Sequence, residues 1–172
     1  MTTGTCADCG FVFAEIGPAE APAKLRGFAR RYRAPLTRFL PGEDGDTLVR
    51  RRPEPGTWSA LEYAAHVRDM FAAFDRRVTW QAAGYPAGAG AVTGEPAPVA
   101  ELDRVAVADE LAANAERLAA SLEAVAPEGW HDEGNEARSV LSTARRAVHE
   151  GNHHLLDIGR VLRAVREQAK DD

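Results

Sequence analysis

Residues 145–162 read Arg-Arg-Ala-Val-His-Glu-Gly-Asn-His-His-Leu-Leu-Asp-Ile-Gly-Arg-Val-Leu. The apolar residues of this stretch recur at helical spacing, which predicts a helix. His149 and His153 lie four residues apart, so both imidazoles lie on one face of that helix, about one turn apart. Two neutral imidazoles on one face can bind one divalent metal ion. The same spacing is common in pairs of solvated histidines, so it does not establish a metal site by itself.

The string H-E-G-N-H at residues 149–153 also matches the H-E-x-x-H signature of zinc proteases, in which the glutamate is the general base. The extended form of that signature requires glycine at position 156 and histidine at 159, where this chain has Leu156 and Gly159. No segment shows the period-two alternation of the strands on which such proteases rest. A metal-dependent hydrolase that uses metal-bound water, with Glu150 as base, is therefore the weaker alternative.

Composition narrows the class of protein. A chain of 172 residues with a net charge of −5 is expected to form one domain without general affinity for nucleic acid. No apolar run approaches the roughly 20 residues of a membrane span, and the N-terminal residues do not resemble a signal peptide. We therefore expect a cytoplasmic protein with no nucleic-acid or membrane partner.

Cys6 and Cys9 form a Cys-x-x-Cys pair that is followed by Gly10. This pattern is typical of one knuckle of a zinc ribbon, but a closed zinc site needs four ligands and the chain has no second cysteine pair. His131, His154 or a second chain could complete such a second metal site. The favoured interpretation is a relic or a redox-sensitive thiol pair in the N-terminal segment.

The periodicity divides the chain into an irregular lead, residues 1–17, and a helical bundle, residues 18–170. Four helices are expected: residues 19–40, a helix that begins at residue 59 with an apolar stripe to residue 78, residues 102–125, and residues 139–168. Pro35 should kink or shorten the first helix, and residues 41–57 read as a polar loop.

Residues 84–98 are rich in glycine, alanine and proline and form a long connection between the second and third helices. A connection of this length lets those two helices run parallel. The prediction is an all-α four-helix bundle of up-down-down-up order, with a long crossover between helices two and three.

The second helix has the clearest start. Ser59 is the expected N-cap, Glu62 completes a capping box, and Trp58 and Tyr63 are placed for a hydrophobic staple. His66 lies at the edge of the apolar stripe that follows. A histidine in that position is usually solvated, and it matters only if the helix turns it toward the histidine pair on the fourth helix.

Two stretches together resemble a known family. Residues 52–69, Arg-Pro-Glu-Pro-Gly-Thr-Trp-Ser-Ala-Leu-Glu-Tyr-Ala-Ala-His-Val-Arg-Asp, and residues 147–158, Ala-Val-His-Glu-Gly-Asn-His-His-Leu-Leu-Asp-Ile, are similar to the DinB-like superfamily. Its relatives include bacillithiol and mycothiol S-transferases and the mycothiol-dependent maleylpyruvate isomerase. The resemblance implies an up-down-down-up bundle that holds zinc or nickel through one histidine on helix two and the pair on helix four. These positions are His66, His149 and His153 here.

The resemblance further implies a metal-dependent transferase that activates a low-molecular-weight thiol for attack on a small electrophile. Mycothiol is the expected thiol, because frequent alanine and arginine with scarce lysine are typical of high-GC genomes. Glu150 could orient a ligand or act as a base, and Asp157 could hold the second N–H of His153. His154 is expected to face away from the pair.

Two further alternatives stay open: a non-catalytic bundle that binds a metal or a small ligand, and a homodimer formed through an exposed helix face. Residues 84–98 depart from the family pattern, in which aromatic and acidic residues are expected, so the electrophile is not specified.

Overall fold

The computed structural model describes residues 4–85, 97–131 and 139–171, and no strand is present in these parts of the chain. The elements follow in the order η1 (Phe13–Glu15), α1 (Glu20–Thr37), α2 (Gly45–Arg50), α3 (Ala60–Ala82), η2 (Val99–Glu101), α4 (Arg104–Glu123), η3 (Pro127–Trp130) and α5 (Val140–Asp171). The predicted all-α class is confirmed.

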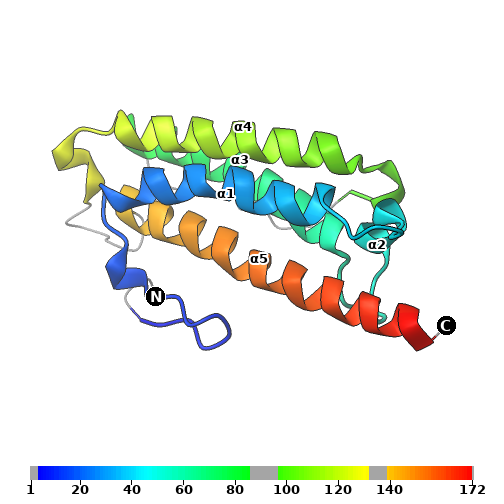
Figure 1. The fold of residues 1–172 in the computed structure, drawn as a ribbon. Helices are drawn as coiled ribbons and strands as arrows, with labels where there is room; N and C mark the ends of the chain where they lie inside the picture. Colours follow the sequence, from blue (N-terminus) through cyan, green and yellow to red (C-terminus); the bar gives the residue numbers. More distant parts are fainter. Residues whose placement is uncertain (1–3, 86–96, 132–138, 172) are drawn as a thin grey trace.

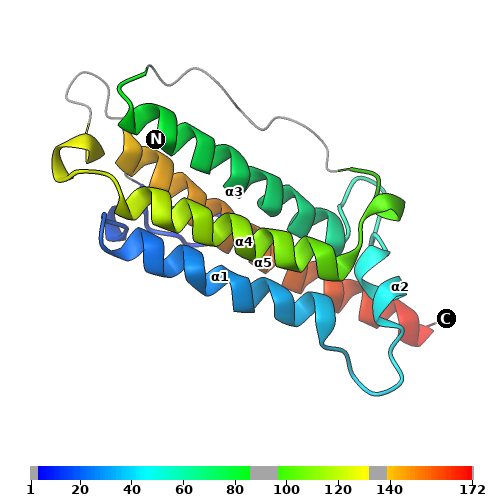
Figure 2. The same ribbon diagram turned by 90° about the horizontal axis from the view of Figure 1, so that it is seen from above.

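The four long helices form a bundle (Figures 1 and 2). Helix α1 runs in one direction, α3 and α4 both run back, and α5 returns, as the colour gradients along the ribbons show. Around the bundle, α1 packs on α4, α4 on α3, α3 on α5 and α5 on α1. The order is therefore up-down-down-up, as predicted.

Helices α3 and α4 are parallel, so the chain has to cross back between the end of one and the start of the other. Most of the predicted crossover, residues 86–96, lies outside the described residues. The chain becomes helical again after Asp103, whose side chain accepts hydrogen bonds from the backbone N–H groups of Val105 and Ala106 at 2.9 and 2.7 Å. This is a regular N-cap, and it fixes where α4 begins.

The bundle core sets how closely α1 approaches α5. The largest fully buried side chains come from all four long helices and from α2: Tyr32, Phe28, Phe71, Leu25, Leu36, Leu61, Leu111, Leu118, Leu122, Ile158, Val49 and Val67. The Tyr32 hydroxyl donates to the Gly151 carbonyl oxygen at 2.8 Å. A Cβ atom on Gly151 would lie 2.6 Å from the Phe28 ring, so only glycine lets the two helices meet here.

Two local predictions need correction. Residues 41–57 were expected to form a polar loop, but they contain α2, whose N-cap Asp44 accepts from the N–H groups of Asp46 and Thr47. Helix α1 ends at Thr37, three residues earlier than expected and two after Pro35. The shortening that Pro35 predicts is confirmed, because proline leaves the last turn without one backbone donor.

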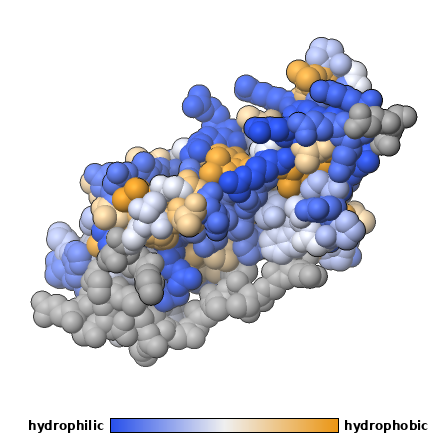
Figure 3. All heavy atoms as spheres, turned by 90° about the horizontal axis from the view of Figure 1, so that it is seen from below, coloured by the Kyte–Doolittle hydropathy of each residue, from blue (hydrophilic) through white to orange (hydrophobic). Residues whose placement is uncertain are grey.

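None of the helices in the described ranges combines the length and the apolarity needed to cross a bilayer. Figure 3 shows the side of the molecule on which α5 lies. Hydrophilic side chains cover most of the described surface there, and hydrophobic residues appear as small separate patches.

Candidate metal centre

The start of α3 is held by the predicted capping box. Ser59 Oγ accepts from the Glu62 N–H at 3.3 Å, and the Glu62 carboxylate accepts from the Ser59 N–H at 2.8 Å. The Trp58 and Tyr63 rings lie 5.3 Å apart, which confirms the hydrophobic staple. These contacts fix the first two turns of α3 and thereby the position of His66, whose ring lies 5.2 Å from that of Trp58.

His66 lies across from α5, where it meets Glu150 and His154. One potential ligand atom from each of these three residues lies within 4.8 Å of the other two, and we refer to them as the His66 group. The rings of His66 and His154 are 5.1 Å apart and nearly perpendicular, at 89°. The Oε2 atom of Glu150 lies 3.3 Å from Nε2 of His154. Two helices therefore contribute two imidazoles and a carboxylate to one point.

The charges in this group are coupled. Burial, followed by the positive charge that His154 can carry, lowers the pKa of His66. Burial raises the pKa of Glu150, but His154 and then His149 outweigh it, so that the pKa of Glu150 is lowered overall. Burial lowers the pKa of His154, but Glu150 and Asp157 raise it overall. A neutral His66 and an ionised Glu150 are the forms in which these side chains bind metals.

Aromatic rings border the His66 group on the α3 side. The Tyr63 ring stacks on His154 with the centroids 5.4 Å apart and an angle of 29° between the planes. Trp58, the residue before the N-cap of α3, packs against the ring of His66. The two rings restrict the motion of both histidines and provide apolar surface beside them.

A second group lies on the neighbouring side of α5. It consists of Cys6, Cys9, His149 and His153, each with one potential ligand atom within 4.8 Å of the others, and we refer to it as the cysteine group. Cys6 Sγ lies 3.8 Å from Nδ1 of His153. The His149 and His153 rings are 5.2 Å apart, as their spacing on one helix predicts.

The described part of the N-terminal lead, residues 4–17, runs beside α5 (Figure 1) and is attached to it by two polar contacts. Arg145 Nε donates to the Ile16 carbonyl oxygen at 2.9 Å, and Arg160 Nη2 donates to the Asp8 carbonyl oxygen at 3.2 Å. The lead is therefore held to α5 at one position before and one position after the histidines of that helix.

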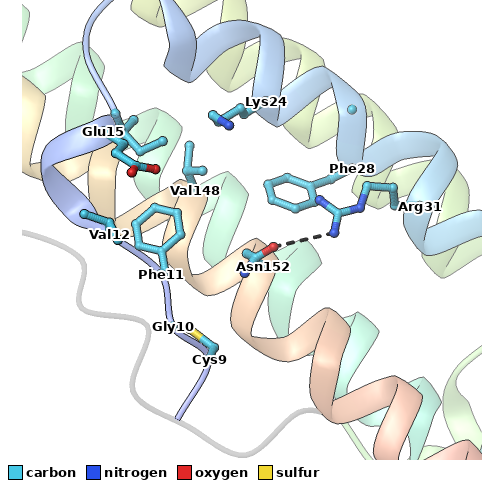
Figure 4. Close-up of a pocket in the computed structure, with 12 residues that line it drawn as sticks. Cys9, Gly10, Phe11, Val12, Glu15, Lys24, Phe28, Arg31, Val148 and Asn152 are labelled. Atoms are coloured by element: carbon cyan, nitrogen blue, oxygen red, sulfur yellow. Dashed lines mark hydrogen bonds between the residues drawn. The ribbon is translucent and has the colours of Figure 1, made fainter. Parts of the chain in front are cut away.

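A hollow of about 340 Å³ lies between the lead, α1 and α5 (Figure 4). Lys24 and Arg31 extend toward it from α1, and Arg31 Nη2 lies 3.5 Å from Asn152 Oδ1 on α5. Cys9 is among the lining residues, so the hollow borders the cysteine group.

The structure divides the trio that the resemblance implies. His149 and His153 lie with the two cysteines, whereas His66 lies with His154 and Glu150; within the described parts of the chain, the three do not form a group of their own. His154 was expected to face away from the pair and was left out of the site. Its ring lies 5.3 Å from that of His153 and 5.1 Å from that of His66. It belongs to the His66 group and also, with His153 and Asp157, to a third group of potential ligands.

One sequence signal could have identified His154. Residues 150 and 154 are a second i,i+4 pair that overlaps the pair at 149 and 153. Asp157 is close to both histidines of the dipeptide, with Oδ2 3.1 Å from His154 Nδ1 and 3.6 Å from His153 Nε2. His131, considered as a partner for the cysteines, belongs to none of the groups found among the described residues.

A model of the DinB superfamily matches residues 28–158, about three-quarters of the chain. The chain belongs to the DinB superfamily. Searches of curated proteins and of solved structures gave no significant match. Membership of the DinB superfamily fits a metal-dependent enzyme in the broad sense, and it is consistent with the groups of potential metal ligands that α5 contributes to.

The donor chemistry fits a divalent transition metal. Imidazole, thiolate and carboxylate are the ligand types that Zn²⁺ takes in proteins. His149 Nε2 is buried and has no hydrogen-bond partner among the residues that the structure describes, so a metal ion could satisfy it. The residues of this DinB protein are therefore suited to hold such an ion.

Proposed function

We propose that this protein is a metal-dependent transferase that activates a low-molecular-weight thiol, such as mycothiol, for attack on a small electrophile. The observation that carries the proposal is the His66 group, in which two imidazoles and one carboxylate from two helices converge. Three protein ligands leave a position open for a substrate, which is typical of catalytic rather than structural sites.

A divalent ion held by this group would supply positive charge that favours the thiolate over the thiol form of the substrate. His66 would contribute a neutral nitrogen, whereas His154, whose pKa Glu150 and Asp157 raise against the effect of burial, would release its proton when it binds the ion. Asp157 lies 3.1 Å from Nδ1 of His154, where it orients the ring. Glu150 offers one carboxylate oxygen to the group and is also an acceptor for a proton released beside it. Trp58 and Tyr63 exclude water from one side of the histidines.

The DinB resemblance implies a different ligand set, namely His66, His149 and His153. That set requires His149 and His153 to turn away from the cysteines. Because His154 belongs only to the first set and His149 only to the second, His154→Ala and His149→Ala distinguish the two by which variant loses activity.

The test is a thiol-transfer assay. The zinc- or nickel-loaded protein is incubated with mycothiol or bacillithiol and monochlorobimane, and the fluorescent adduct is measured. We expect thiol-dependent adduct from the wild type and from His131→Ala, whose histidine lies outside the donor groups, and loss of the adduct in His66→Ala. A wild type that forms no adduct above the metal-free background contradicts the proposal.

A hydrolase is the second candidate, and the position of Glu150 in the His66 group supports it. In that case the Glu150 carboxylate would accept a proton from the attacking water. Cleavage of an ester or amide without any thiol, abolished in Glu150→Gln, would favour the hydrolase. Neither activity in a folded, metal-loaded protein would leave a non-catalytic metal-binding bundle.

A further inference from the structure

The cysteine group takes no part in the proposed chemistry, yet its local structure is specific. The Cys-x-x-Cys segment forms a tight turn in which Gly10 N–H donates to the Cys6 carbonyl oxygen at 2.8 Å and Cys6 N–H donates to the Phe11 carbonyl oxygen at 2.9 Å. Gly10 has φ +70°, a conformation that favours glycine. An antiparallel bridge between Thr5 and Val12 closes the turn.

The turn brings its two sulfurs to one side. Both lie within 4.8 Å of each other and of one ring nitrogen from each of His149 and His153. Backbone N–H groups of Cys9 and Asp8 lower the pKa of Cys6, whereas burial raises the pKa of Cys9. A metal ion that binds the pair therefore has to displace the thiol proton of Cys9.

The two histidines are oriented in a matching way. His149 Nδ1 lies 3.5 Å from a Glu150 oxygen, and His153 Nε2 lies 3.6 Å from an Asp157 oxygen. The other nitrogen of each ring faces the cysteine side or lacks a partner. Nδ1 of His153 lies 3.8 Å from Cys6 Sγ, and Nε2 of His149 is buried without a hydrogen-bond partner in the described parts of the chain. A carboxylate behind each metal-binding imidazole is the usual arrangement at zinc sites.

The spacing also fits a tetrahedral ion. Zinc–sulfur and zinc–nitrogen bonds of about 2.3 and 2.0 Å place neighbouring ligand atoms roughly 3.3–3.8 Å apart. The separation of 3.8 Å between Cys6 and His153 is close to that range, and all four ligand atoms lie within 4.8 Å of one another. Shifts on the order of 1 Å in side chains would complete the site.

Other contacts hold the turn in place. The Phe11 and Phe13 rings lie 5.5 and 5.0 Å from the ring of His149. Together with the bonds from Arg145 and Arg160, they keep the lead on α5. The site therefore does not depend on the ion alone to bring its ligands together.

We propose that Cys6, Cys9, His149 and His153 bind one Zn²⁺ ion in a closed, four-ligand structural site that ties the N-terminal lead to α5. Binding forms two zinc–sulfur and two zinc–nitrogen bonds, and the two thiol protons pass to solvent. Four protein ligands leave no open position, so the ion takes no part in catalysis. The proposal does not rest on the transferase activity, since the two donor groups share no residue.

The test uses Co²⁺ as the probe, added to the metal-free, reduced full-length protein. A tetrahedral site with two thiolates gives an intense sulfur-to-cobalt charge-transfer band in the near ultraviolet and strong visible bands. We expect both in the wild type and in His66→Ala, whose cysteine group is intact. We expect loss of the charge-transfer band and of one bound metal per chain in Cys9→Ser, and loss of one metal in His149→Ala.

Several results would overturn the proposal. One is a wild type without the charge-transfer band, and another is a band that persists in Cys9→Ser. A third is a mass that reports a Cys6–Cys9 disulfide in protein purified under reducing, zinc-replete conditions, because that result assigns the pair to redox chemistry. Circular dichroism shows whether each variant keeps its helices; should His149→Ala unfold, His153→Gln replaces it. An intact band without thiol transfer contradicts only the proposed function.

Discussion

Two sides of one helix differ in how their donor groups are assembled. In the cysteine group, a local turn of the lead supplies two potential ligands and the i,i+4 pair of α5 supplies the other two. In the His66 group, α3 reaches α5 through the packing of the bundle, and the capping box at Ser59 sets its register. His153 and His154 are adjacent in sequence but contribute to different groups, because successive residues on a helix point about 100° apart. Between the two groups they also form, with Asp157, a third set of potential ligand atoms within 4.8 Å of one another.

The largest effect should come from breaking only the His66 group. We expect His154→Ala to reduce thiol transfer by more than the roughly 10–100-fold that is typical of losing an outer partner of a metal ligand. The cobalt charge-transfer band of the cysteine group should stay unchanged. Steady-state rates and absorption spectra of the same preparation measure both, with His131→Ala as the matched histidine control. A variant that keeps full activity would remove His154 from the site.

Asp157 is the residue that the two sides share, since it lies near His153 and His154. We expect Asp157→Asn to weaken metal binding in both groups by roughly 10–100-fold, because an amide holds an imidazole N–H less strongly than a carboxylate does. Competition with a chromophoric chelator measures each affinity. An effect confined to one group would show that Asp157 orients only one of the two histidines.

A substitution of Gly151 tests whether the close packing of α1 on α5 stabilises the helix that carries both groups. A Cβ at this position would lie 2.6 Å from the buried Phe28 ring, so we expect Gly151→Ala to lower the free energy of unfolding by about 1–3 kcal/mol. Gly159→Ala is the matched control in the same helix, because a Cβ there meets nothing within 4 Å. That change should raise stability by about 0.5–1 kcal/mol. Urea unfolding measures both, and equal effects would contradict the packing argument.

The smallest effect should come from an ion pair remote from both groups. Arg166 donates to Glu43 at 2.7 Å and, with the Leu40 N–H, lowers the pKa of Glu43 to about 2. A lowered carboxyl pKa gives stability that is present above the ordinary value near 4.5 and is lost as pH falls toward 2. The thermal midpoint of Glu43→Gln should therefore approach that of the wild type as pH falls from about 5 to 2.

A constant difference in midpoint between Glu43→Gln and the wild type over that pH range would contradict the assigned pKa. The pair is only partly buried, so added salt should reduce the difference at neutral pH. Metal content should be equal in the two proteins at neutral pH.

Structural features that depend only on residues close together in the sequence were predicted correctly. The capping box and staple at the start of α3, the N-cap of α5 and the helical periods of the four long helices all appear as expected. These features are set within a few residues, which is why local patterns reveal them. Helix α2 was missed because six residues are too few for a periodic signal, although Asp44 followed by Thr47 is a recognisable cap.

The grouping of the donors could not be predicted in the same way. Whether His66 faces His153 or His154 depends on the rotation of α3 against α5, which no local pattern records. The docking of the lead was equally hidden, because Cys6 and His153 are separated by 147 positions. The resemblance correctly gave the superfamily and the helix, α5, on which most of the potential ligands lie. The second i,i+4 pair, at residues 150 and 154, would have pointed to His154.

The most direct test of this account is the number of metal ions per chain, measured by elemental analysis on zinc-saturated wild type, Cys9→Ser, His149→Ala and His154→Ala. Two separate groups predict two ions in the wild type and one in each variant. A single ion that is kept in Cys9→Ser and His154→Ala but lost in His149→Ala would instead establish the trio of His66, His149 and His153, and would contradict the division of α5 into two sites.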